Sequence, residues 1–223
     1  MNAQSDTTEP PREKAYVIHM PRCHERRMWM DQQMPRTGFD WEYWPATDGK
    51  NLSREDYAGW FAGRYHECPW LKDAMGTWAC AISHIRLWHG LLASPPPSGV
   101  GFIFEDDAQV RPGMAQEWPA LLKELPEDWD FVFFNPWDER CVDSRARHSE
   151  HFHRLIRVEA TPSMVSYAVN VRRLTVNLPR ILPLDEEIDF HLARRVAALK
   201  LFIYSHHDWL ARSDTGFESV REG

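Results

Sequence analysis

The chain has 223 residues, and 26 Lys and Arg against 33 Asp and Glu give it a formal net charge of −7. This length fits a single domain, and an acidic chain repels phosphate backbones, so nucleic acid is not an expected partner. Hydrophobic residues make up 43% of the sequence, which is enough for a core. No apolar run reaches the roughly 18–20 residues of a membrane span.

Composition along the chain predicts a disordered tail over residues 1–13, a single domain over 14–210 and a C-terminal tail over 211–223. The N-terminal tail is polar, unlike a signal peptide. The cysteines are scattered and form no C-x-x-C motif, which is typical of reduced thiols: Cys23, Cys68, Cys80 and Cys141. We therefore expect a cytoplasmic protein. Without a basic patch or an amphipathic anchor, any contact with the inner membrane face would be weak.

Hydrophobic periodicity predicts strands and helices that alternate along the first half of the chain. In order these are a strand at 15–20, a helix at 22–33, a strand at 39–45, a helix at 74–92, a strand at 100–104, a helix at 113–125 and a strand at 129–134. Residues 152–158 and 163–169 alternate like a hairpin or paired strands, followed by helices at 171–178 and 186–199 and a last strand at 201–205. This order predicts an α/β domain with a mostly parallel central sheet flanked by helices.

Three consecutive carboxylates, Glu105, Asp106 and Asp107, follow the strand at 100–104. Open α/β sheets bind ligands at the carboxyl ends of their strands. Adjacent carboxylates repel one another unless a cation lies among them, and such oxygen ligands suit Mg²⁺ or Mn²⁺. In extended geometry Glu105 and Asp107 would share one face, which predicts a metal clamp. An acidic turn that caps the next segment is the alternative.

Other catalytic motifs do not account for the sequence. The Ser83-His84 pair lacks a G-x-S-x-G motif, so a serine hydrolase is not indicated. The glycines at 99 and 101 precede a strand instead of opening a helix, which does not match a dinucleotide fingerprint, and no phosphate-binding P-loop motif occurs.

Five motifs occur in order: AYVIHMPRCHERR at 15–27, PATDGK at 45–50, GTWACAISHIRLW at 76–88, FEDD at 104–107 and Ile188-Asp189. Together they resemble glycosyltransferase family 25, which includes bacterial lipooligosaccharide galactosyltransferases and procollagen galactosyltransferases. The resemblance spans about residues 15–210. It implies a GT-A-type fold, a UDP-sugar donor of galactose or glucose, and Mn²⁺ or Mg²⁺. It also implies an inverting transfer to a glycan or another hydroxyl acceptor.

The resemblance also implies roles for single residues. Side chains expected to bind the nucleotide sugar are His19, Arg22, Arg26, Arg27, Asp48, Ser83, His84 and Asp106. The metal ligands implied are Glu105 and Asp107, with His207 after the last strand as a further candidate. Asp189 is the expected acceptor-side base or sugar-hydroxyl ligand. A solvated acidic face is its alternative, because three other acids precede it: Asp185, Glu186 and Glu187.

Some features leave alternatives open. His19 stands where relatives favour Asn, which leaves the donor's identity open. A non-catalytic relative that binds a nucleotide sugar or carbohydrate is a second hypothesis. A third is an iron or zinc enzyme that uses His151 and His153, although their polar surroundings favour a loop.

The sequence contains 11 tryptophans, and their positions divide them into two groups. Trp78, Trp88 and Trp129 fall on apolar stripes or buried strands and are expected in the core. Those near predicted loops can stack on sugar rings and suit an acceptor cleft: Trp41, Trp44, Trp60, Trp70 and Trp137.

Overall fold

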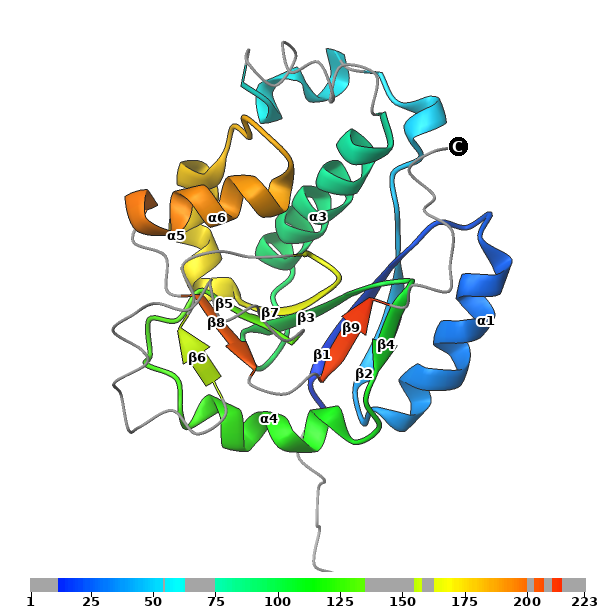
Figure 1. Cartoon of the computed structure of the whole chain (residues 1–223), viewed down its shortest axis with the longest axis vertical. Helices are drawn as coiled ribbons and strands as arrows, with labels where there is room; N and C mark the ends of the chain where they lie inside the picture. Colours follow the sequence, from blue (N-terminus) through cyan, green and yellow to red (C-terminus); the bar gives the residue numbers. More distant parts are fainter. Residues whose placement is uncertain are drawn as a thin grey trace, which may run out of the picture.

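A seven-stranded sheet lies at the centre of the computed structural model, which describes residues 12–53, 55–62, 75–134, 155–157, 163–199, 203–206 and 210–213 (Figure 1). The strand order is β2-β1-β3-β7-β5-β8-β6. Its strands are β1 (Lys14–His19), β2 (Asp40–Pro45), β3 (Val100–Glu105), β5 (Phe131–Phe133), β6 (Leu155–Arg157), β7 (Ser166–Asn170) and β8 (Ile203–His206).

Five of these strands, β2, β1, β3, β5 and β8, run in one direction, and β7 and β6 run in the other. The helices are α1 (His24–Gln33), α3 (Met75–Ala93), α4 (Met114–Leu122), α5 (Val171–Ile181) and α6 (Ile188–Leu199). Short 3₁₀ segments are η1 (Met34–Arg36), η2 (Gly49–Asn51) and η3 (Glu55–Trp60). The predicted α/β architecture, a mostly parallel central sheet flanked by helices, is confirmed.

The two faces of the sheet bury separate hydrophobic clusters. On β1, Tyr16 and Ile18 belong to the cluster with residues of α3, α5 and α6, whereas Ala15 and Val17 belong to the cluster with residues of α1 and α4. Successive side chains of a strand point to opposite faces, so an unbroken apolar run supplies both clusters at once. Figure 1 shows α3, α5 and α6 on one side of the sheet and α4 on the other.

Helix α3 is the longest helix among the described residues, with 19 residues. It ends at Ala93, immediately before the proline-rich segment at 94–97 that cannot continue a helix. Its Gly90 faces β2, where an added Cβ atom would lie 2.7 Å from Cη2 of Trp44. The helix therefore packs closely against the sheet. No helix within the described ranges has the length and apolarity needed to cross a bilayer.

Two details of the strand assignment differ from expectation. The segments at 152–158 and 163–169 do not pair, because β6 pairs with β8 and β7 lies between β3 and β5. Alternation identifies a strand but not its partner, which long-range packing selects. Residues 211–213, assigned to a tail, form strand β9 (Ala211–Ser213), which pairs antiparallel with β4 (Ala108–Val110).

The tryptophans expected in the core are there: Trp78, Trp88 and Trp129 are each at most 3% exposed. Three of those expected near loops, Trp41, Trp44 and Trp60, are partly buried against the two clusters. Trp70 and Trp137 lie outside the described residues.

Candidate functional site

The carboxyl ends of three neighbouring parallel strands bring the predicted residues to one edge of the sheet. Ile18 on β1 is paired with Glu105 on β3, and His19 is paired with Pro45 on β2. The turn after β1, the turn after β2 and the acidic turn after β3 therefore start side by side. This is where an open α/β sheet binds its ligands.

Asp106 connects the turn after β1 with helix α1. Its Oδ2 accepts a hydrogen bond from the backbone N–H of Met20 at 3.2 Å and lies 2.8 Å from Nδ1 of His19. Its Oδ1 accepts a hydrogen bond from Nη1 of Arg26 at 2.9 Å. Asp106 is only 5% exposed, and both of its oxygens have partners within the chain. These contacts show that Asp106 holds His19 and Arg26 in place. A contact between Asp106 and the donor stays a prediction.

The two predicted arginines of α1 point to different places. Arg26 is buried. Its Nη1, which donates to Asp106, also lies 3.4 Å from Oδ2 of Asp107. Arg27 lies instead over the ring of Tyr43, with Cζ 4.5 Å from the ring centroid, and its Nε is 3.9 Å from Asp31. Arg26 is thus part of the carboxylate cluster and Arg27 is directed away from it.

Asp107 carries negative charge that the nearby Arg26 does not fully balance. Burial, and then the nearby charge of Glu105, raise the pKa of Asp107 to about 6. Its Oδ1 is buried without a hydrogen-bond partner among the described residues. An orphaned carboxylate oxygen in such a place fits a ligand for a divalent cation. The strand ends at Glu105, so Asp107 occupies a turn and not the extended position that the sequence predicted.

Glu105 points toward α3, where it ends a buried chain of polar groups. Its Oε1 lies 3.1 Å from Nε2 of His84, whose Nδ1 lies 3.0 Å from Oη of Tyr167. Trp88 donates Nε1–H to the same Oη at 2.9 Å. Burial raises the pKa of Tyr167, which keeps its hydroxyl protonated. A neutral His84 that accepts at Nδ1 and donates Nε2–H to Glu105 satisfies every group in this chain.

The turn at 45–50 is bound to α3 by Ser83. The backbone N–H of Thr47 donates to Oγ of Ser83 at 2.8 Å, and that hydroxyl donates to the carbonyl oxygen of Ala79 at 2.6 Å. A Cβ atom on Gly49 would lie 2.9 Å from the carbonyl oxygen of Met75, so glycine permits this close approach. These contacts give Ser83 a structural role, and its expected contact with the donor stays a prediction.

Asp48 lies at the surface of this turn. Its Oδ1 accepts the backbone N–H of Lys50 at 3.0 Å, and its Oδ2 accepts from Nη1 of Arg22 at 2.6 Å. The backbone hydrogen bond from Lys50, and the bond from Arg22 after it, lower the pKa of Asp48 although desolvation opposes them. Arg22 and Asp48 are therefore brought together, one from each of two adjacent turns.

Asp189 lies on another element, in the first turn of α6, where its Oδ1 accepts a hydrogen bond from the backbone N–H of Phe190 at 3.0 Å. Helix α6 packs on α5. A role for Asp189 beside the carboxylates stays a prediction. His207, and the pair His151 and His153, lie outside the described residues.

Sequence reasoning missed two groups of residues. The alternative of a solvated acidic face includes Asp185, but this residue is 8% exposed, and its Oδ1 lies 2.7 Å from Nδ1 of His191 and 2.9 Å from Nη2 of Arg194. The solvated interpretation is therefore wrong for Asp185.

Sequence reasoning assigned no chemical role to Cys80, whose thiol donates to Oε1 of Glu105 at 3.4 Å. Its spacing of four residues from His84 on a helix was the available signal.

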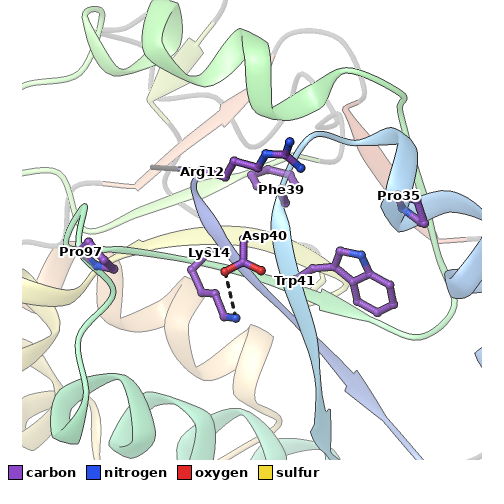
Figure 2. A pocket seen from close by; sticks show the side chains of 7 residues that line it. All are labelled: Arg12, Lys14, Pro35, Phe39, Asp40, Trp41 and Pro97. Atoms are coloured by element: carbon purple, nitrogen blue, oxygen red, sulfur yellow. Dashed lines mark hydrogen bonds and ion pairs between the residues drawn. The ribbon is translucent and has the colours of Figure 1, made fainter. Parts of the chain in front are cut away.

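A hollow of about 670 Å³ lies at the opposite end of β1 and β2, where these strands begin (Figure 2). In it Lys14 forms an ion pair with Asp40 at 3.3 Å. The residues that line it are Arg12, Lys14, Pro35, Phe39, Asp40, Trp41 and Pro97. Of the residues that the sequence singles out, it contains Trp41, which is expected near an acceptor cleft, and it is separate from the carboxylate cluster.

Two solved structures show some similarity to this one. A glycosyltransferase involved in the glycosylation of the major capsid of PBCV-1 has a TM-score of 0.44 and 11% identity, over 95% of this chain and 96% of that chain. Mouse xyloside xylosyltransferase 1, in its apo form, has a TM-score of 0.38 and 10% identity, over 85% of this chain and 70% of that chain.

Curated relatives are similar in sequence. A Glycosyltransferase 25 family member of Aedes aegypti is 27% identical over 53% of this chain and 20% of its own length. Those of Anopheles gambiae and Drosophila melanogaster are 25% and 24% identical over 77% and 78% of this chain, and 30% of their own lengths. The chain thus spans less than a third of each relative. Residues 12–172 match the family described as "Glycosyltransferase family 25 (LPS biosynthesis protein)", and the chain belongs to glycosyltransferase family 25.

Proposed function

We propose that this chain is a metal-assisted, inverting glycosyltransferase with a GT-A-type fold. It transfers a hexose, galactose or glucose, from a UDP-sugar to a hydroxyl group of a glycan acceptor. The observation that carries this proposal is the buried Oδ1 of Asp107, which has no hydrogen-bond partner among the described residues and lies next to Glu105 at the carboxyl ends of parallel strands. Family membership supports the reaction class.

Asp107 and Glu105 are the residues that would hold Mn²⁺ or Mg²⁺. The pKa of Asp107, raised by burial and by Glu105, marks an excess of negative charge that a divalent cation relieves. When bound, such a cation neutralises the charge that develops on the diphosphate leaving group.

The chain's own cations and hydrogen bonds shape the donor side. Arg26 is held by Asp106 and lies 3.4 Å from Asp107, so it can add positive charge near the diphosphate. Arg22 and Asp48, joined by a hydrogen bond, would form the neighbouring wall of the proposed nucleotide pocket. Because Asp106 fixes both His19 and Arg26, this part of the site is in place before the donor binds.

On the acceptor side, inversion requires a base that removes the proton of the attacking hydroxyl while the sugar–phosphate bond breaks. We assign this role to Asp189. Its partly exposed carboxylate in the first turn of α6 can reach solvent and therefore an acceptor. The scattered cysteines, typical of reduced thiols, favour a cytoplasmic location, and the lack of a basic patch or amphipathic anchor in the sequence favours at most weak contact with the inner membrane face.

A screen of UDP-sugars for transfer and donor hydrolysis, with Mn²⁺ and with a chelator, tests the proposal. We expect turnover with UDP-galactose or UDP-glucose that depends on the metal. Asp107→Asn should lower kcat by at least about 100-fold, since it removes a ligand for the charge that develops in the transition state. Asp128→Asn, a change at an exposed carboxylate, is the matched control. Turnover that Asp107→Asn leaves unchanged would contradict the metal role, and donor binding without turnover would indicate a non-catalytic relative.

A further inference from the structure

Three different ligand groups meet between α3 and the end of β3. Cys80 and His84 are four residues apart on α3, so their side chains lie on one face of the helix. Glu105 ends β3 and faces them. The Sγ of Cys80, the Nε2 of His84 and a carboxylate oxygen of Glu105 all lie within 4.8 Å of one another. Within the part of the chain that the structure describes, no other group of His, Cys, Asp and Glu has this property.

The separations suit a small tetrahedral cation. Zinc bonds of about 2.0–2.1 Å to nitrogen or oxygen and about 2.3 Å to sulfur place tetrahedral ligand atoms roughly 3.3–3.8 Å apart. Here Oε1 of Glu105 lies 3.1 Å from Nε2 of His84 and 3.4 Å from Sγ of Cys80. Adjustments of a few tenths of an ångström would therefore bring these pairs to bonding geometry.

We propose that Cys80, His84 and Glu105 form a binding site for Zn²⁺, with its fourth position left to water. A thiolate and an imidazole favour zinc over Mg²⁺ or Mn²⁺, which prefer oxygen ligands. Three protein ligands and an open position are typical of zinc sites that exchange a ligand. With a thiolate, a neutral imidazole and one carboxylate, the bound cation is neutralised within a partly buried site.

The surroundings of His84 support this site. A metal on Nε2 requires the proton on Nδ1, and Oη of Tyr167 lies 3.0 Å away, where it can accept that N–H. Trp88, one turn after His84, donates to the same oxygen and holds it in place. On binding, the His84 proton moves from Nε2 to Nδ1, the Tyr167 hydroxyl changes from donating to Nδ1 to accepting from it and turns its hydrogen away, and the thiol of Cys80 loses its proton to solvent. One proton is released for each ion bound.

The site goes beyond the proposed transferase activity, since zinc binding needs neither donor nor acceptor. The two would be connected through Glu105, which we also assign to the Mn²⁺ or Mg²⁺ ligands. Zinc on Cys80, His84 and Glu105 withdraws that carboxylate from Asp107. In the active enzyme, Zn²⁺ would therefore inhibit in competition with Mn²⁺.

A cadmium titration of the full chain tests binding without any assay of activity. In a variant that carries Cys23→Ser, Cys68→Ser and Cys141→Ser, Cys80 is the only thiol, and a Cd–thiolate absorption band reports directly on it. We expect the band to saturate at one ion per chain. Zn²⁺ should remove it and excess Mg²⁺ should not. The matched control keeps Cys23 as the only thiol, a partly buried cysteine outside the three-residue group, and should give no band at one equivalent.

Two further variants in the Cys80-only background distinguish binding by all three ligands from binding by the Cys80 thiol alone. Glu105→Gln removes a ligand, and Tyr167→Phe removes the hydroxyl behind His84. Each should weaken cadmium binding by about tenfold or more, with folding checked by circular dichroism. A Cys80-only chain without a band at one equivalent would overturn the site. So would a Cys23-only chain with the same band, or equal affinity in the folded Glu105→Gln and Tyr167→Phe variants. None of these results depends on whether the transferase assay succeeds.

Discussion

At the scale of single residues, three consecutive carboxylates have three different environments. Asp106 is bonded to Arg26 and His19, Glu105 to His84, and Asp107 keeps a buried oxygen without a partner among the described residues. Three adjacent carboxylates repel one another, but two of them have hydrogen-bond partners on opposite sides of the strand end: Asp106 bonds to α1 and Glu105 to α3. Asp107 keeps an unfavourable electrostatic energy from burial and from its acidic neighbours. A bound cation would therefore stabilise Asp107 more than the other two carboxylates.

This cost predicts a pH-dependent stability. An acid with a native pKa of about 6 and an unfolded value near 3.8 binds more protons in the native state between these two pH values. Stability therefore falls as pH rises through that window, by about 3 kcal/mol in total. In chelator, Asp107→Asn should raise the free energy of unfolding at pH 7 by about 1–2 kcal/mol, and this gain should vanish near pH 4.

Urea unfolding at pH 4 and pH 7 measures this effect. Asp128→Asn, at an exposed carboxylate, is the control and should change stability by no more than about 0.5 kcal/mol at either pH. A lower stability of Asp107→Asn than of the unmodified chain at pH 7 would show that Asp107 is already balanced without a metal.

At the scale of elements, α3 organises the site from one side. Ser83 binds the turn after β2, His84 contacts the end of β3, and the start of the helix lies against Gly49 of η2. Two of these contacts come from adjacent residues, Ser83 and His84, and the third lies about two turns earlier, at Met75, where the helix begins. The position of α3 therefore sets the distances between the turns at the carboxyl ends of the strands.

Gly49→Ala tests this close approach. The new Cβ would lie 2.9 Å from the carbonyl oxygen of Met75, which is backbone and cannot rotate away. We expect a loss of about 1–3 kcal/mol in the free energy of unfolding, because the turn must move off the helix. Gly59→Ala is the matched control, since an added Cβ there meets no atom within 4 Å. Thermal unfolding of the two variants side by side gives the comparison, and equal melting temperatures would contradict the tight contact.

At the scale of the whole molecule, residues near the C-terminal end of the described chain complete the core. Leu210 and Ala211 are fully buried in the cluster that contains residues of α1 and α4, and both donate backbone N–H groups to the carbonyl oxygen of Phe134. Ser166 on β7 donates its hydroxyl to the carbonyl oxygen of Ala211 at 3.2 Å. The segment therefore joins β4, β7 and the end of β5.

Leu210→Ala should accordingly destabilise the whole fold by about 2–5 kcal/mol, through lost burial and a residual cavity. Leu122→Ala removes the same atoms from a leucine that is 42% exposed and should cost less than about 1 kcal/mol. Chemical denaturation followed by fluorescence of the buried tryptophans reports on both. Similar losses for the two variants would mean that Leu210 is not part of the core.

Sequence patterns predicted the order of strands and helices because apolar periodicity is a local property. The acidic turn was also visible, since its three residues are adjacent. The pairing of the strands was not visible in the sequence. In the structure β7 lies between β3 and β5, and β6 pairs with β8. Contacts between distant residues were also beyond reach. Arg26 and Asp106 are 80 residues apart, and only the assembled sheet shows why Arg26 enters the cluster and Arg27 does not.

The division of the carboxylates between the two faces of the sheet has a mechanical consequence. Asp106 is bonded to α1 on one face, and Glu105 is bonded to α3 on the other. The backbone between them is a single peptide unit. A cation held by Glu105 and Asp107 would therefore restrain both layers through that unit. Its binding free energy would add to the cohesion between the layers as well as to the chemistry at their edge.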